Sequence, residues 1–184
     1  MSPMLMIVVG YVTINAVLAV PFTLQARADF QRQGKWSRST AIFSGLIMHG
    51  HFLTTIALAW LDRGSLFAAN LISLTMGAAL FLGGACVLFL GRYAYGSQQR
   101  VYGMLEDKLI RHGIYKRTRN PQYVGYGSMF AGAAIASGSG FALISTLLFM
   151  AIIHVFITQV EEPHLKQAFG EDFGQYTKAV PRYF

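Results

Sequence analysis

Two adjacent carboxylates follow a long apolar stretch late in the chain. Glu161 and Glu162 come directly after residues 141–160, which carry no Asp, Glu, Lys or Arg. Carboxylates at the end of an apolar helix are costly to desolvate and repel each other, which indicates that something in the fold uses them. On a helix their side chains point about 100° apart. The sequence therefore predicts that the two glutamates have different partners.

The second candidate region for chemistry is residues 113–125, which read GIYKRTRNPQYVG. Asn120 is predicted to cap a helix that begins at Pro121, because Asn accepts hydrogen bonds from free backbone N–H groups and Pro fits the first helical position. The positive end of the helix dipole and the basic residues before it, Arg119 among them, favour an anionic ligand. A positive loop before a capped helix is equally expected in a membrane protein without such a site.

Tyr115 and Tyr123 flank this helix start. Their rings could pack on a flat base such as adenine or against a cation, or they could belong to the aromatic belt at a membrane surface. Carboxylates, cations and aromatic rings can form one site only if the elements that carry them meet at the same face of the membrane.

Composition places the chain among integral membrane proteins. Of its 184 residues, 54% are hydrophobic and 12% are charged, and the mean hydropathy is +0.43. The net charge of +7 is explained by loops that face an anionic cytoplasmic leaflet, so no nucleic-acid partner is predicted, and nothing calls for a protein partner. Cys86 is the only cysteine and the histidines form no i, i+4 pair, so neither a disulfide nor a metal site is expected.

Hydropathy predicts an all-α, five-span membrane bundle that forms a single domain over residues 1–184. A helix of about 20 apolar residues crosses the hydrocarbon core of a bilayer. The first such stretch lacks the basic start and the cleavage site of a signal peptide, so it is expected to stay in the protein. The predicted spans are residues 4–24, 41–61, 66–90, 121–136 and 141–160.

The basic residues predict the orientation of these spans. Fourteen Lys and Arg residues lie in the segments 27–38, 92–119 and 166–182, which five spans place on one side, and only Arg63 lies on the other. The N-terminus is thus expected outside, with the C-terminus and both candidate regions facing the cytoplasm. The membrane would be the inner membrane of a bacterium or the endoplasmic reticulum of a eukaryote.

Small and polar residues inside the spans predict how the helices pack. Small residues four apart allow close approach, and these pairs are Ala79 with Gly83, Gly127 with Ala131, and Gly132 with Ala136. Polar side chains are costly in lipid, so an inward orientation is expected for Asn15, His49, His51, Asn70 and His154.

Pro163 should kink or end the last span. The apolar stripe of Leu165, Ala168 and Phe169 then predicts a short helix on the membrane surface that ends at Gly170.

Four motifs in the second half of the chain resemble a known family when they are taken together. They read Gly113-x-Tyr115, Arg119-x-Pro-x-Tyr-x-Gly125, Glu161-Glu-x-x-Leu-x-x-x-Phe-Gly170 and Val180-Pro-Arg182. Each is weak alone, but the series in this order resembles the isoprenylcysteine carboxyl methyltransferase and phospholipid N-methyltransferase superfamily of small integral membrane enzymes. Asn120 departs from the usual His, keeping the cap but losing a proton carrier near neutral pH, and Phe173 stands where Tyr is usual.

The resemblance implies S-adenosylmethionine as the cofactor, bound within residues 105–184 at the cytoplasmic face. It implies a lipophilic acceptor that enters from the bilayer, such as an isoprenylcysteine carboxylate or a phospholipid amine, and leaves open whether oxygen, nitrogen or sulfur is methylated. Arg119 or Arg182 would hold an anionic acceptor or lipid phosphate, and Glu161 or Glu162 would orient the acceptor or take its proton. By position, the implied cofactor residues are Leu109, Ile110, Gly113, Tyr115, Asn120, Pro121, Tyr123, Glu161 and Glu162.

Two other functions remain open on the sequence. Membrane sterol reductases, which use NADPH, carry a similar Arg-x-Pro-x-Tyr region, although those proteins have more spans. A non-catalytic membrane protein that binds lipid is the third hypothesis.

Overall fold

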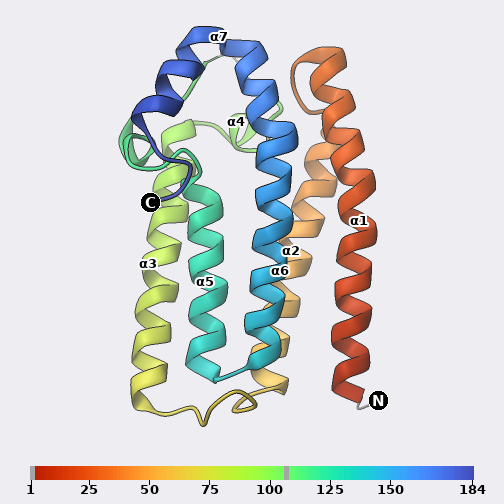
Figure 1. Cartoon of the computed structure of the whole chain (residues 1–184), viewed down its shortest axis with the longest axis vertical. Helices are drawn as coiled ribbons and strands as arrows, with labels where there is room; N and C mark the ends of the chain where they lie inside the picture. Colours follow the sequence, from red (N-terminus) through yellow and green to blue (C-terminus); the bar gives the residue numbers. More distant parts are fainter. Residues whose placement is uncertain (1–2, 106–107) are drawn as a thin grey trace.

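The long helices stand side by side and α7 bends across one end of the bundle (Figure 1). The computed structural model describes residues 3–105 and 108–184, and within them it is helical with no strand, as predicted. The elements are α1 (Pro3–Gln33), α2 (Arg38–Leu61), α3 (Leu71–Tyr95), α4 (Gln98–Val101), a 3₁₀ turn (Gly113–Lys116), α5 (Pro121–Ser137), α6 (Gly140–Phe156), a π-helical turn (Ile157–Glu161) and α7 (Glu162–Ala179).

Among the described residues, four stretches are long and apolar enough to cross a membrane. They are Val9–Gln33, Arg38–Leu61, Leu71–Tyr95 and Gly140–Ala179, so the chain is an integral membrane protein with several candidate spans. The remaining predicted span, 121–136, is a helix that begins at Pro121 as expected, but at 17 residues it is shorter than these four stretches and is not among them.

The predicted start of the third span is wrong. Residues 66–70 are not helical, and α3 begins at Leu71 because Asn70 caps it. The Asn70 side-chain oxygen accepts from the backbone N–H of Ser73, and the Ser73 hydroxyl accepts from the backbone N–H of Asn70, both at 3.0 Å. Asn70 is therefore a helix cap and not an inward-facing group within a span.

Helices α3 and α5 pack most closely, through glycines that differ from the predicted pair on α3. A Cβ placed on Gly84 would lie 2.7 Å from the carbonyl oxygen of Gly125, whereas one on Gly83 would meet nothing within 4 Å. The contact on α3 repeats every seven residues, at Gly77, Gly84 and Gly91, and residues seven apart lie on nearly the same face after two helical turns. On α5 the predicted Gly132 does take part, against Gly77 and Phe81.

The last long helix continues past Pro163 instead of ending there. The π-helical turn Ile157–Glu161 leads directly into α7, with Pro163 in its first turn, so the missing N–H of Pro163 falls where the regular α-helical ladder is already interrupted. The chain leaves helical geometry at Gly170 (φ 51°, ψ −124°), at the predicted end of the surface helix. Residues 171–179, which follow the predicted end of that helix, are helical as well.

The polar residues of the spans follow the inward prediction only in part. His51 is 2% exposed and bonds to the hydroxyl groups of Tyr11 and Thr55, which joins α1 to α2. His154 is exposed, contrary to the prediction, whereas His49 is exposed but lines a cavity between the helices. Each has a local partner that removes the need for burial, since His49 bonds the Gly45 carbonyl at 2.7 Å and His154 bonds the Tyr183 hydroxyl at 2.9 Å.

The two ends of the bundle differ in what they carry. The loop between α1 and α2, the segment between α3 and α5, and α7 lie at one end, while the N-terminus, the α2–α3 loop and the α5–α6 turn lie at the other (Figure 1). Both candidate regions for chemistry therefore meet at the α7 end.

Candidate active site

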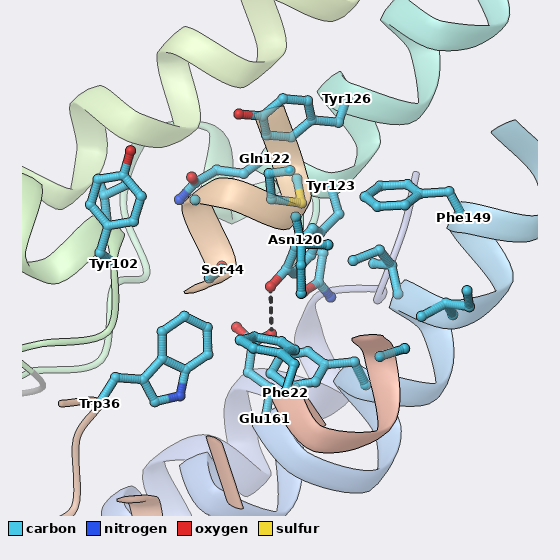
Figure 2. Close-up of a pocket in the computed structure, with 18 of the residues that line it drawn as sticks. Phe22, Trp36, Ser44, Tyr102, Asn120, Gln122, Tyr123, Tyr126, Phe149 and Glu161 are labelled. Carbon is cyan, nitrogen blue, oxygen red and sulfur yellow. Dashed lines mark hydrogen bonds between the residues drawn. The ribbon is translucent and has the colours of Figure 1, made fainter. Parts of the chain in front are cut away.

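Two cavities adjoin at the α7 end of the bundle. The larger measures about 1130 Å³ to its open mouth, and Figure 2 shows its lining; the smaller measures about 610 Å³. They share five lining residues, which form the wall between them: Tyr95, Tyr115, Arg119, Asn120 and Glu161.

Polar contacts hold this shared wall in place. The Tyr123 hydroxyl donates to Glu161 at 3.2 Å, the dashed line of Figure 2. The Gln122 amide donates to the Tyr115 hydroxyl at 3.3 Å, and the Tyr115 carbonyl accepts from the Tyr176 hydroxyl at 2.7 Å. Burial raises the pKa of Tyr115, so its hydroxyl stays protonated throughout the neutral range.

Glu162 faces two arginines that approach from different parts of the chain. Its carboxylate accepts from Arg182 Nε at 2.9 Å and Nη2 at 2.7 Å, and lies 3.2 Å from Arg119 Nη2. The hydrogen bonds to Glu162 raise the pKa of Arg182, which keeps the guanidinium charged. The prediction that the two glutamates have different partners is confirmed, because Glu161 bonds Tyr123.

The predicted cap at Asn120 is wrong, although α5 does begin at Pro121. The Asn120 side chain makes no capping hydrogen bond. Its amide donates instead to the Arg182 carbonyl at 3.1 Å, which also accepts from the Thr118 hydroxyl at 3.1 Å. Together with the Arg119 N–H, which donates to the Pro181 carbonyl at 3.0 Å, these bonds fasten the C-terminal segment to the start of α5.

The predicted cofactor residues gather mainly around the smaller cavity. Leu109, Ile110 and Glu162 line it alone, while Tyr115, Asn120 and Glu161 belong to the shared wall and Tyr123 lines the larger cavity. Gly113 and Pro121 line neither cavity. Gly113 begins the 3₁₀ turn at a φ of 60°, and the Pro121 ring packs against Gly91 of α3.

The four predicted catalytic residues fall into two groups. Arg119 and Glu161 lie in the shared wall, where a bound molecule on either side can reach them. Glu162 lines only the smaller cavity, and Arg182 lines neither. Arg119 Nε is buried and has no hydrogen-bond partner among the described residues, which makes it a donor available to a ligand.

Much of the larger cavity is built by residues outside the four motifs. Trp36 comes from the loop between α1 and α2, Arg92 from the last turn of α3, and Tyr102 from the segment that follows α4. Their only signal in the sequence is that Arg92 and Tyr102 lie in or beside the basic segment 92–119. Apolar side chains complete the lining from the membrane side: Phe22, Met48, Phe149, Ile152, Ile153 and Phe156.

A largely apolar groove of about 1300 Å³ between α1 and α6 continues from the larger cavity. Six residues line both spaces: Asn15, Ala19, Thr23, Phe149, Ile152 and Phe156. The far end of the groove lies beside Tyr11, His51 and Ser145. An apolar group can therefore extend from the wall of Glu161 to the membrane interior without leaving the protein surface.

Comparison with known proteins identifies the family of this chain. The model of the phospholipid methyltransferase family matches residues 72–172, more than half of the chain. The Protein-S-isoprenylcysteine O-methyltransferase of Schizosaccharomyces pombe is 37% identical over 76 residues, which are 40% of this chain and 31% of that protein. The Phosphatidylethanolamine N-methyltransferase B of Dictyostelium discoideum is 28% identical over 133 residues, 70% of this chain and 66% of that protein. No solved structure gives a significant match.

These matches favour a methyltransferase over the NADPH-dependent reductase and the non-catalytic protein. Both relatives are methyltransferases by name, and the matched region contains three of the four motifs that the sequence singles out. The chain belongs to the phospholipid methyltransferase family, a family of small membrane enzymes that take the methyl group from S-adenosylmethionine.

Proposed function

We propose that this protein methylates a lipophilic acceptor in the larger cavity with S-adenosylmethionine bound in the smaller one. The observation that carries this proposal is the shared wall: two cavities of different chemistry meet at Glu161, Arg119, Asn120 and Tyr115. A methyl group that passes from a cofactor in the smaller cavity to an acceptor in the larger one would cross only this wall.

The smaller cavity has the chemistry that the cofactor requires. Arg100, Lys108 and the unpartnered Nε of Arg119 suit a carboxylate, and Glu161 and Tyr115 in the wall suit a sulfonium. An adenine base can pack on the apolar side formed by Leu109, Ile110, Leu165, Phe169 and Phe173.

The residues of the wall position the acceptor and manage its proton. Bound S-adenosylmethionine supplies an electrophilic methyl group, and positioning is the main contribution that the protein must add. Glu161, held by the Tyr123 hydroxyl, orients an acceptor atom and accepts its proton when the acceptor is an ammonium. A carboxylate acceptor has no proton to lose, so there Arg119 holds it by charge-assisted hydrogen bonds.

Glu162 and Arg182 act on the site through other residues. Both were predicted to contact ligands, but the ion pairs of Glu162 with Arg119 and with Arg182 favour a positioning role. Arg182 neutralises Glu162 and its carbonyl accepts from the Asn120 amide. These contacts fix the position of the shared wall.

We further propose that the chain is one membrane domain of five spans with its N-terminus outside. The short helix α5 would be the fourth span, covered along its length by α3, and residues 105–184 would form the cofactor region at the cytoplasmic face. Support comes from the basic segments 27–38, 92–119 and 166–182, which lie at the α7 end (Figure 1). The membrane would be the bacterial inner membrane or the endoplasmic reticulum, according to the host.

Calorimetry on the detergent-purified protein tests this function. We expect S-adenosylhomocysteine to bind and NADPH not to bind. Leu109→Trp, which fills the smaller cavity, should abolish binding, while Leu148→Trp in the membrane groove should retain it. Binding of NADPH without S-adenosylhomocysteine, or equal effects of the two substitutions, would refute the assignment. Transfer of a labelled methyl group to membrane lipids then tests turnover.

A further inference from the structure

Arg92 differs from Arg119, the other arginine of the larger cavity, because no described carboxylate neutralises it. Arg111 pairs with Asp172, and Arg119 and Arg182 pair with Glu162. Arg92, half-buried in the last turn of α3, has no carboxylate partner in the part of the chain that the structure describes. Its Nη2 donates to the Gln98 side chain at 3.1 Å, and its guanidinium carbon lies 5.4 Å from the centre of the Tyr102 ring.

The position of Arg92 separates it from the cofactor cavity. It lines the larger cavity and not the smaller one, whereas Arg119 belongs to both. The neutral partners fix the guanidinium without cancelling its charge, so the larger cavity has a preformed site for an anion. Trp36, whose Nε1 is buried without a partner among the described residues, lines the same cavity, as does Tyr102 (Figure 2).

The apolar side of the same cavity calls for a ligand with a hydrocarbon chain. The groove between α1 and α6 runs along α1 from Thr23 to Tyr11, which is about 18 Å of helix at 1.5 Å per residue. That length is close to one leaflet of a hydrocarbon core of about 30 Å. One chain of a membrane lipid therefore fits between the wall and the far end of the groove.

We propose that Arg92 binds the anionic group of the methyl acceptor and so selects anionic amphiphiles. This inference rests on the proposed function and adds a specificity residue to it. The acceptor's anionic group lies at Arg92, its chain occupies the α1–α6 groove, and a reacting amine separate from the anion lies at Glu161. A phospholipid phosphate and a prenylcysteine carboxylate share this chemistry, and they differ in whether the anion is also the reacting group.

The first test measures binding of hexadecyl phosphate and of the neutral amphiphile hexadecanol to protein in nanodiscs. Arg92→Gln should weaken hexadecyl phosphate binding about 10-fold or more, since a charge-assisted hydrogen bond contributes about 1.5–3 kcal/mol and 1.4 kcal/mol is a factor of ten. Arg92→Lys should recover part of the loss. Binding of hexadecanol and of S-adenosylhomocysteine should change less than about 2-fold.

Arg38→Gln is the matched control, because Arg38 is exposed at the same end of the bundle and lines neither cavity. If it weakens hexadecyl phosphate binding as much as Arg92→Gln does, the effect is the charge of the whole surface and the inference fails. Unchanged phosphate binding in Arg92→Gln, or an equal loss of hexadecanol binding, also overturns it. Failure of S-adenosylhomocysteine to bind the unaltered protein refutes the proposed function instead.

The second test distinguishes the two sources of the anion. Phosphatidylethanolamine and N-acetyl-S-farnesylcysteine are compared as methyl acceptors in the same nanodiscs. For whichever is methylated, Arg92→Gln should raise KM about 10-fold or more. With S-adenosylmethionine saturating, Glu161→Gln should lower kcat more for a phospholipid amine, which also needs Glu161 as a base, than for a carboxylate acceptor. A KM that Arg92→Gln leaves unchanged for a methylated acceptor contradicts the assignment.

Discussion

Glu162 is 18% exposed and lies between the guanidinium groups of Arg119 and Arg182. Removing one member of a largely buried ionic group leaves the others without compensation, which costs more than the group gains by forming. Because these contacts join the start of α5 to the last residues of the chain, the cost should appear as loss of stability before it appears as loss of chemistry.

Glu162→Gln is therefore expected to lower the free energy of unfolding by about 1–3 kcal/mol. The measurement is reversible unfolding in mixed micelles, combined with Arg182→Gln in a double-mutant cycle that should show coupling. Glu171→Gln, at an exposed position on α7, should change stability by less than about 0.5 kcal/mol. Additive effects of the Glu162 and Arg182 substitutions would show that their contact is not stabilising.

A second carboxylate, Asp62, acts at the opposite end of the bundle. It follows α2 and accepts from the backbone N–H of Phe141 at 2.9 Å and from the hydroxyls of Ser139 and Ser65 at 2.8 and 2.7 Å. Burial alone would raise its pKa, but these hydrogen bonds outweigh burial and hold the pKa of Asp62 below its ordinary value of 3.8. The carboxylate thus stabilises the first turn of α6 from a neighbouring helix.

The pH dependence of this contribution follows from the lowered pKa. A depressed folded-state pKa adds stability above the unfolded-state value and loses it as the pH falls through the folded-state value. Asp62→Ala should lower the free energy of unfolding by about 1–2 kcal/mol, and by the same amount from about pH 8 to about pH 5. The difference in unfolding free energy from wild type should shrink only below pH 3.8. The neighbouring exposed Arg63→Ala is the control, and a difference that already closes near pH 6 would contradict this account.

At the scale of the helices, the closest contact is the glycine face between α3 and α5. Adjacent glycines make the test direct: a methyl group on Gly84 meets the Gly125 backbone at 2.7 Å, and one on Gly83 meets nothing. Gly84→Ala should destabilise by about 1–3 kcal/mol because backbone atoms must move. Gly83→Ala should be neutral or stabilise by up to about 1 kcal/mol, since Ala is the better helix former. Equal effects on the unfolding free energy would mean that this contact is not close.

The elements that sequence reasoning predicted well carry local signals. Pro121 begins α5 and Gly170 interrupts α7, and both depend on the backbone limits of single residues. The start of α3 was predicted five residues too early because Leu66 and Phe67 continue the apolar run. A hydropathy profile does not detect the helix cap at Asn70. The small residues of α3 were read at a spacing of four, although the packed face repeats every seven.

The site was predictable only where its residues belong to motifs. The sequence named Tyr115, Asn120 and Glu161 as candidates for one site, and they line the same wall. It did not predict the partner of Asn120, because the Arg182 carbonyl lies 62 residues away in sequence. Trp36 and Arg92 come from the first half of the chain, where no short pattern relates them to residues 113–125. Only the packing of α1, α2 and α3 around the site brings them to it.

Considered as a whole, the molecule places the chemistry at one end and leaves a path along its side. Helix α1 joins the bundle through Tyr11 and His51 at one end of that path and through Asp29, Ser37 and Thr40 at the other. Between these contacts Ala19 lines both the groove and the larger cavity. The passage from membrane to wall therefore runs past Ala19.

Ala19→Trp should obstruct this passage. We expect kcat/KM for the lipid acceptor to fall by about 10-fold or more, while the affinity for S-adenosylhomocysteine stays the same because the smaller cavity is untouched. Val17→Trp is the matched control, since Val17 is 62% exposed and lines neither space. Similar kinetics for the two variants, measured in nanodiscs, would show that acceptors reach the wall by another route.

The open side of the groove between α1 and α6 also bears on how the enzyme must be assayed. The tail of a single-chain detergent suits this groove as well as the chain of an acceptor does. In micelles the detergent therefore competes with the acceptor for the groove. The apparent KM should then rise in proportion to the mole fraction of detergent, most steeply for anionic head groups near Arg92. A methylated lipid that leaves by the groove must insert its chain into the surrounding leaflet. The rate of turnover should therefore depend on lateral pressure in the membrane.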